Sequence, residues 1–198
     1  MRTQVLALAA LVAGLVGAPA RADDLFRTQV GSADFSGADL GIDVGAVMGS
    51  SGSINTSGMA GGGHAGYNLQ NGPIVGGVSA NMLFGNVSGG ASSQSYTFNS
   101  LGSLRGQAGY VTGPVLLFGS LGWAFSSANY TNLSASNSQT LTGYVFGVGA
   151  EFAVTRNVSL RAELSHYDFG NAVYYMPAGA ATVSTSQNVI SLGVATHF

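Results

Sequence analysis

Apolar residues recur at every second position along several stretches of the chain. Between residues 38 and 48 the even positions are all apolar, whereas positions 39, 41, 43 and 45 are Asp or Gly. Successive side chains of a β-strand point to opposite faces, so this stretch predicts a strand with one oily face and one polar face. The same period recurs over residues 64–69, 74–84, 104–110, 115–125, 144–154, 158–165 and 188–198. The pattern therefore predicts eight strands.

Turn residues join three pairs of these strands and keep their oily faces together. The dipeptides Asn71-Gly72 and Thr112-Gly113 predict two-residue hairpin turns, and residues 155–157 predict a three-residue turn. Each turn places apolar residues opposite each other: Leu69 faces Ile74, Tyr110 faces Val115, and Phe152 faces Leu160 or its close neighbours. The third turn also places Glu151 opposite Arg161. A slip by one residue would put every apolar side chain on the wrong face, so the turns support the face assignment independently.

The composition identifies the surroundings of such strands. Charged residues make up 7% of the 198 residues, with no Lys, two Glu and no Cys, against roughly 25% charged residues in a soluble domain. Beyond residue 20, no apolar run approaches the roughly 18 residues of a membrane helix. Hydrophobicity spread at period two is typical of a membrane β-barrel. A β-sandwich also alternates, but its outer face usually carries abundant Lys and Glu. The net charge of −2 argues against nucleic acid as a partner.

The chain begins with the pattern of an export signal. Arg2 precedes an apolar core over residues 5–16, and Ala20-Arg21-Ala22 matches the small-x-small cleavage pattern. We therefore expect a signal peptide at residues 1–22, with cleavage after Ala20 as the alternative. A short periplasmic N-terminal extension (residues 23–36) and the barrel domain (residues 37–198) follow.

Length and loops set the size of the barrel. A spanning strand needs about 9–11 residues, so the mature chain has room for eight strands and real loops, but not for the sixteen strands of a water-filled porin. Residues 50–62, 86–100, 126–139 and 170–186 are rich in Ser, Gly, Asn and Ala and predict flexible, solvated loops. Outer-membrane barrels have short periplasmic turns and longer extracellular loops, so both mature termini are expected in the periplasm.

Charged residues within the predicted strands all lie on the face opposite the oily one. They are Asp39, Asp43, Arg105, Glu151, Arg161 and Glu163. An Arg at the lipid midplane of a barrel would cost about 2–4 kcal/mol, so a lipid boundary explains the one-sided placement. We expect these residues to form a structural charge network that fills a narrow lumen. Because four acids face two arginines, some carboxylates should be hydrated or close to a rim. A narrow, cation-preferring pore is the alternative.

Aromatic residues gather where a membrane barrel carries its interfacial girdles. One group is expected near the periplasmic rim and a second near the outer rim. The first comprises Tyr67, Tyr110 and Phe198, and the second Phe84, Trp123, Phe125, Tyr144, Tyr167 and Phe169.

Several segments resemble a known family in their order and spacing. Residues 62–70 (GGHAGYNLQ), 101–110 (LGSLRGQAGY), 148–152 (VGAEF) and 161–170 (RAELSHYDFG) are similar to small opacity-type outer-membrane proteins, also called outer-membrane immunogenic or porin-like β-barrel proteins. The terminal Phe198, with apolar residues at alternate positions before it, resembles the signal read by the barrel-assembly machinery. Ser79 and Gln107 stand where this family usually has an acid and a second arginine, which implies a thinner internal charge network.

The resemblance implies an antiparallel, up-and-down eight-stranded barrel in the outer membrane of a Gram-negative bacterium. Its implied role is envelope integrity and the display of surface loops, without an enzyme activity or a cofactor. The implied partners are outer-membrane lipid and lipopolysaccharide, together with the barrel-assembly machinery and periplasmic chaperones during biogenesis.

A lipid-A-modifying hydrolase is the enzymatic alternative, because some small outer-membrane barrels use Ser, His and an acid. Its candidates are Ser165 and His166, but neighbouring residues of a regular strand face opposite sides and cannot form a hydrogen-bonded dyad. His64, His166 and His197 lie on different strands and at different levels, so the sequence predicts no metal site.

Overall fold

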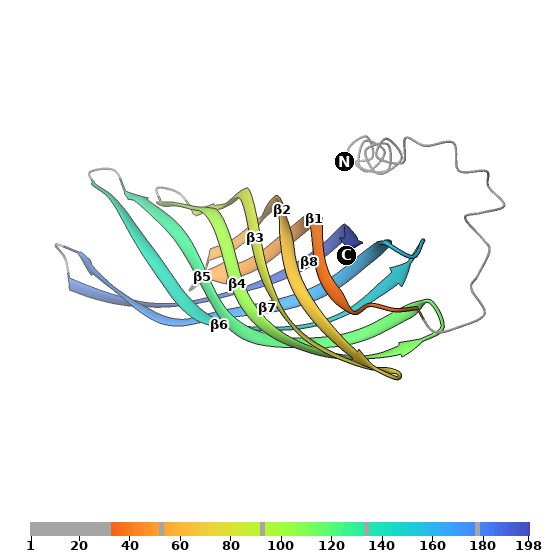
Figure 1. Cartoon of the computed structure of the whole chain (residues 1–198). Helices are drawn as coiled ribbons and strands as arrows, with labels where there is room; N and C mark the ends of the chain where they lie inside the picture. Colours follow the sequence, from red (N-terminus) through yellow and green to blue (C-terminus); the bar gives the residue numbers. More distant parts are fainter. Residues whose placement is uncertain (1–32, 52–53, 92–93, 133–134, 177–178) are drawn as a thin grey trace, which may run out of the picture.

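Eight antiparallel strands form a closed barrel in which each strand pairs with its neighbours in the chain and the last strand pairs back to the first (Figure 1). The computed structural model describes residues 33–51, 54–91, 94–132, 135–176 and 179–198. The strands are β1 (Gly37–Ser51), β2 (Ile54–Asn71), β3 (Ile74–Ala91), β4 (Gln94–Thr112), β5 (Val115–Asn132), β6 (Ala135–Ala153), β7 (Val158–Met176) and β8 (Gly179–His197). The predicted all-β, up-and-down, eight-stranded architecture is confirmed.

None of the described segments is a helix with the length and hydropathy needed to span a membrane. The predicted signal peptide, residues 1–22, lies outside the described residues, as do residues 23–32 of the predicted extension.

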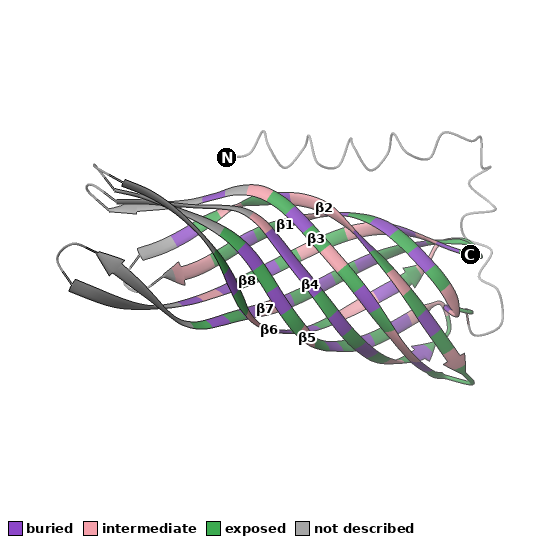
Figure 2. Cartoon of the chain, turned by 60° about the vertical axis from the view of Figure 1, so that its left-hand side comes forward, coloured by how far each residue is buried: buried purple, intermediate pink, exposed green. Residues whose placement is uncertain are grey.

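The two faces of the wall follow the predicted alternation. On β1, Leu40 and Ile42 are 56% and 55% exposed, whereas Asp39 and Asp43 are buried. Figure 2 shows the same exchange of exposed and buried positions along neighbouring strands. A closed barrel has only one small interior, so inward side chains are buried and outward ones are not. The outer wall is consequently oily and the inner one holds the polar groups.

Three turns lie at the same end of the barrel as the C-terminus, and we call this end the terminal end. The turns of the first two hairpins are Gly72-Pro73 and Gly113-Pro114, so the predicted pairings Leu69–Ile74 and Tyr110–Val115 are wrong by two residues. Asn71 faces Ile74 and Thr112 faces Val115. Both glycines have φ = 59°, which suits the first central position of a type II′ turn. Proline fits a turn because it has no N–H to donate to a ladder.

The third turn agrees with its prediction. Glu151 faces Arg161 and Phe152 faces Leu160 across the β6–β7 hairpin. The parity of all three turns is as predicted, and each strand therefore keeps its oily face outward.

The strands continue through most of the four segments predicted as flexible loops, so that prediction is wrong. At the distal end, opposite the turns, β5 extends to Asn132, which pairs with Ala135 of β6. Backbone pairing needs no apolar side chain, so the ladder persists through a Ser- and Asn-rich sequence. The 18 residues of β5 span roughly 60 Å at about 3.3 Å per residue. Even when tilted, they exceed the apolar band of about 25 Å.

The barrel wall is split at the distal end between β6 and β7. Their described ladder ends at the pair Tyr144–Asp168, whereas β5–β6 pairing continues to Asn132–Ala135 and β7–β8 pairing to Met176–Gly179. Figure 1 shows these two hairpins diverging. We call the gap between residues 135–143 of β6 and residues 171–176 of β7 the distal seam.

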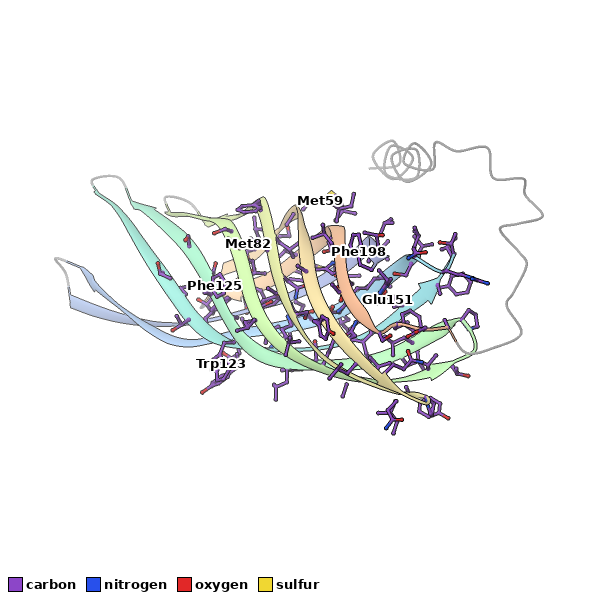
Figure 3. The ribbon with its side chains drawn as sticks, in the orientation of Figure 1. Met59, Met82, Trp123, Phe125, Glu151 and Phe198 are labelled. Carbon is purple, nitrogen blue, oxygen red and sulfur yellow. The ribbon has the colours of Figure 1, made fainter. Side chains whose placement is uncertain are left out.

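Most of the predicted girdle residues lie on the outer wall. Those exposed outward are Tyr67, Phe84, Tyr110, Trp123, Phe125, Tyr144 and Phe198, and Figure 3 shows Trp123 projecting away from the ribbon. Tyr167 and Phe169 are instead buried, at 1% and 6% exposure, so their assignment to the girdle is wrong. They share the inward parity of Arg161 and Glu163 on β7.

Candidate functional site in the barrel interior

The charged residues expected in the lumen all lie inside the barrel wall. Strand β1 carries two of them, β4 and β6 one each, and β7 two. Asp39, Asp43, Arg105, Glu151, Arg161 and Glu163 are between 2% and 9% exposed. At this depth, a charge is stable only when opposite charges and hydrogen bonds surround it.

Glu163 is the centre of the network. Its Oε1 accepts hydrogen bonds from Arg105 Nη1, from Ser165 Oγ at 2.8 Å and from Ser120 Oγ at 3.2 Å. Its Oε2 accepts one from Arg161 Nη2 at 3.0 Å. The carboxylate is therefore shared by two guanidinium groups from β4 and β7, and both hydroxyl groups add their hydrogen bonds at Oε1.

Arg161 links this centre to the terminal end. Its Nη1 lies 3.6 Å from Glu151 Oε2, and its guanidinium stacks over the Phe118 ring at 4.1 Å from the centroid. Glu151 Oε1 also contacts His197 Nε2 at 2.8 Å and accepts a hydrogen bond from Ser159 Oγ. The C-terminal strand is thus tied to the network through a histidine.

The other two acids are paired through His64. Its Nδ1 lies 2.7 Å from Asp43 Oδ2, and its Nε2 lies 3.7 Å from Asp39 Oδ1. Both carboxylates are buried against the imidazole. The expectation that some carboxylates are hydrated or close to a rim stays a prediction. With the two arginines, His64 and His197 bring the potentially cationic groups to the same number as the acids.

Gln107 joins the two halves of the network. Its Nε2 donates to Asn68 Oδ1 at 2.6 Å, and its Oε1 accepts from Arg161 Nη2 at 3.3 Å. Asn68 Nδ2 in turn donates to Asp39 Oδ2 at 3.3 Å. The amide that replaces the expected arginine therefore bridges acid and base across the lumen.

Several polar members of the network were not predicted from the sequence. They are His64, Asn68, Gln107 and His197, together with the serines that bond to the acids, Ser120, Ser159 and Ser165. Each occupies the inward parity of its strand, and that parity was the signal available to find them.

Apolar layers lie on both sides of the polar network, and sequence analysis did not predict them. The terminal cluster comprises Phe35, Val75, Val111, Leu116 and Phe118. The distal cluster comprises Val47, Ala60, Leu83, Val87, Leu101, Ala124, Leu141, Val145, Tyr167, Phe169 and Val189. Runs such as residues 115–118 and 144–146 carry the signal, because an uninterrupted apolar run must place apolar side chains on both faces.

Residues 33–36 cross the terminal mouth as a strap. The Gln70 side-chain amide accepts from Phe35 N at 2.8 Å and donates to Ala33 O at 3.2 Å. Ala33 N donates to Gly113 O at 3.0 Å. Phe35 is 1% exposed and meets the His197 ring edge-on at 5.8 Å. The strap therefore inserts Phe35 into the mouth and contacts opposite sides of the rim.

A small cavity lies where the polar network meets the distal cluster. Its volume is about 10 Å³, and its lining includes Asp43, Arg105, Glu163, Leu83 and Tyr167. This is about the space that one water molecule needs. Close packing extends to the glycines, since a Cβ at Gly193 would lie 2.1 Å from Asp43 Oδ1.

Comparison with known proteins agrees with this architecture. The family model described as "Outer membrane protein beta-barrel domain" matches residues 7–198. The chain belongs to this family. A 22 kDa outer membrane protein of Rhizobium leguminosarum bv. viciae is 30% identical over 146 residues, which are 73% of this chain and 68% of that protein. This outer-membrane barrel is accordingly located in the outer membrane, in contact with its lipid.

Solved structures share the fold at low identity. Neisserial surface protein A superposes with a TM-score of 0.58 at 22% identity, covering 85% of this chain and 99% of that one. Ail, the attachment invasion locus protein of Yersinia pestis, superposes with a TM-score of 0.56 at 15% identity, covering 82% and 99%. At these identities, the likeness concerns the fold alone.

Two arrangements in this outer-membrane barrel bear on hydrolase chemistry. Ser165 lies inside on the charge network, whereas His166 faces outward and contacts Asn188 Oδ1 at 2.8 Å, as the alternation predicts. Ser159, His197 and Glu151 do meet, but Ser159 Oγ and Glu151 Oε1 contact the same Nε2, at 3.0 and 2.8 Å. A catalytic triad needs the acid and the serine on different ring nitrogens.

Metal binding has no geometric support in the described part of the barrel. No three His, Asp or Glu side chains among those residues are placed to hold a metal ion.

Proposed function

We propose that this outer-membrane barrel is a structural and surface protein whose lumen is closed to solutes. It anchors in the membrane through its oily wall and displays the distal strand extensions outside the cell. Short turns face the periplasm in bacterial barrels, so we assign the terminal end to the periplasm and the distal end to the exterior. Both roles are compatible with the filled interior.

The observation that carries the proposal is the unbroken filling of the lumen. The terminal cluster, which includes Phe35, occupies the periplasmic mouth. The network around Glu163 crosses the middle of the lumen, and the distal cluster fills the part beyond it. An ion crossing this barrel would have to displace buried ion pairs and two apolar layers. A channel instead needs continuous water or successive weak sites.

Conductance in planar bilayers tests the closed lumen. We expect no steady current steps from protein whose folding is verified by a heat-dependent gel shift, while a water-filled porin run in parallel conducts. Reproducible steps with preference for cations would contradict the proposal and support the narrow pore. That pore would draw its preference from Asp39, Asp43, Glu151 and Glu163.

We also propose that the barrel is not a lipid-modifying enzyme. The support is that Ser165 and His166 are on opposite faces and that Ser159 is 1% exposed. Lipid A mass spectra from cells with the wild-type protein, Ser165→Ala or Ser159→Ala should be identical to spectra from cells lacking the protein. A mass change that depends on either serine would contradict this.

The proposed partners follow from the outer wall. Phe198 is 76% exposed and directly follows β8, a strand with an apolar outer face, which suits recognition by the barrel-assembly machinery after delivery by periplasmic chaperones. The chain has no Lys, and its six Arg are residues 2, 21, 27, 105, 156 and 161. None of these arginines lies in the distal part of a strand, so we propose that lipopolysaccharide contacts the oily outer wall rather than a cationic patch.

A further inference from the structure

The distal seam leaves two strand edges without a partner in the described structure. Residues 135–143 of β6 pair with β5 alone, and residues 171–176 of β7 pair with β8 alone. Each edge presents backbone N–H and C=O groups toward the seam. Such an edge is a template for a further strand.

Irregular backbone marks the place where the two strands separate. Gly170 has φ = 62°, and its N–H donates to Asp168 Oδ1 at 2.8 Å. At the same place, the β7–β8 register shifts between Asp168 and Asn171. A bulge of this kind bends a strand; beyond it β7 stays paired with β8, whereas its described pairing with β6 has ended. On β6, Gly143 permits close contact at the last pair, because a Cβ there would lie 2.0 Å from Asp168 O.

The two edges lack the usual protection against pairing. Proteins commonly guard an exposed edge with Lys, other charges or Pro. Residues 135–143 (ASNSQTLTG) and 171–176 (NAVYYM) contain none of these. An uncharged edge outside the membrane is therefore available for pairing with another strand.

We propose that the occupant is a second copy of this chain, in a two-fold dimer whose distal seams face each other. β6 runs toward the membrane and β7 runs away from it. A two-fold axis along the membrane normal brings β6 of one copy antiparallel to β7 of the other, and the reverse pair forms at the same time. This interface is self-complementary and closed.

Membrane embedding favours a second copy over a soluble strand, because two copies already share their height and orientation. The wall beside the seam also carries polar groups that suit a protein neighbour better than lipid. His166 contacts Asn188 at 2.8 Å on the outer face, and the Asp168 carboxylate is exposed there as well. Polar groups on an outer wall can hydrogen-bond to a protein neighbour but not to lipid tails.

Cysteine cross-linking tests the dimer directly, because the chain has no native Cys. The variants Thr140→Cys and Val173→Cys place one thiol on each edge. When the two single variants are mixed in one membrane and oxidised, we expect a dimer band at least about ten times stronger than from either alone. The matched control is the pair Ser88→Cys and Thr97→Cys. These two positions face each other across the β3–β4 ladder of one barrel, away from the seam.

Several outcomes would overturn the proposal. One is a dimer band from the mixed variants that is no stronger than the band from the control pair. Another is a disulfide formed within a single Thr140→Cys/Val173→Cys chain, which would mean that the seam closes on itself. The third is a cross-linked adduct that forms only with a different protein. Native mass spectrometry in detergent provides the second measurement. Wild-type protein should be dimeric, and Val173→Lys should be monomeric while keeping its heat-dependent gel shift; a wild-type monomer contradicts the proposal.

Discussion

A carboxylate inside a membrane-spanning cylinder is stable only while its partners remain. Glu163 is shared by Arg105 and Arg161, so Glu163→Gln leaves two buried guanidinium groups with too little opposing charge. We expect the free energy of unfolding to fall by about 3–5 kcal/mol. Equilibrium denaturation in lipid vesicles, followed through the single Trp123, measures the change.

The matched control for that experiment is Asp168→Asn on the same strand. Asp168 is exposed, and the amide oxygen keeps the acceptor for Gly170 N–H, so its effect should stay within about 0.5 kcal/mol. Equal effects of the two substitutions would show that Glu163 is not the centre of a buried network.

Side chains pack so closely at the inner wall that added volume destabilises the barrel, as an unpaired charge does. A Cβ at Gly193 would lie 2.1 Å from Asp43 Oδ1 and 2.9 Å from Ile42 O. Gly193→Ala should therefore lower the free energy of unfolding by about 1–3 kcal/mol through overpacking. The readout is a lower temperature at which the folded band disappears from the gel.

Gly76 is the control for this prediction, because a Cβ there meets no heavy atom within 4 Å. Gly76→Ala lies on the outer wall and should leave the transition temperature unchanged or slightly raised. A barrel that tolerates both alanines equally would have a looser interior than the structure shows.

Among the structural elements, the strap across the terminal mouth has the clearest single anchor. Phe35→Ala removes a ring that is 1% exposed and leaves a cavity in the terminal cluster, so we expect a loss of about 3–5 kcal/mol of unfolding free energy. The variant should still carry no ion current, because the Glu163 network and the distal cluster remain. Ser36→Ala, half-buried on the same strap, loses only a solvent-exposed hydrogen bond to Asp34 and is the control for unfolding; planar bilayers measure the current.

A steady current through the Phe35→Ala barrel would show that the strap alone closes the lumen. An unfolding energy equal to that of Ser36→Ala would show that the strap merely rests on the mouth.

Strand number and strand faces were predictable from the sequence because lipid imposes them. Every outward position within the membrane must be apolar or small, and Leu40, Phe146 and Val148 follow that rule. The register of the turns was harder to predict. The pattern alone selected Asn71-Gly72 as the turn, whereas the turn is Gly72-Pro73, where Pro73 has no N–H to donate; this shift by one residue changes the strand pairing by two. Outside the membrane no hydropathy rule operates, so the distal strands resembled loops.

The interior was predictable only in part for a related reason. Alternation indicates which residues face inward, but partner choice depends on which strands face each other across the lumen. His64 and Gln107 therefore gave no local signal of their roles. Tyr167 and Phe169 were assigned to the girdle by residue type, although their parity places them inside, where their rings stack and the Tyr167 hydroxyl accepts a hydrogen bond from Arg105 Nη2.

At the scale of the whole molecule, the barrel is a cylinder whose alternate residues face either the hydrocarbon outside or the polar interior. Hydrocarbon contacts the outer side chains, and ion pairs between two apolar layers fill the inside. This arrangement accounts for the low charge content of the chain, for the confinement of Arg105 and Arg161 to the lumen, and for an anchor that leaves its distal strands free to meet other molecules.

The most direct measurement of that claim is a nitroxide scan of residues 145, 146 and 148 of β6, one cysteine at a time in the cysteine-free chain; residue 147 is left out because a Cβ there would lie 2.5 Å from Glu163 Oε1. We predict high accessibility to lipid-dissolved oxygen at residues 146 and 148, and low accessibility to both oxygen and a water-soluble nickel reagent at residue 145. Strong access of the nickel reagent at all three positions, with no alternation, would contradict the account.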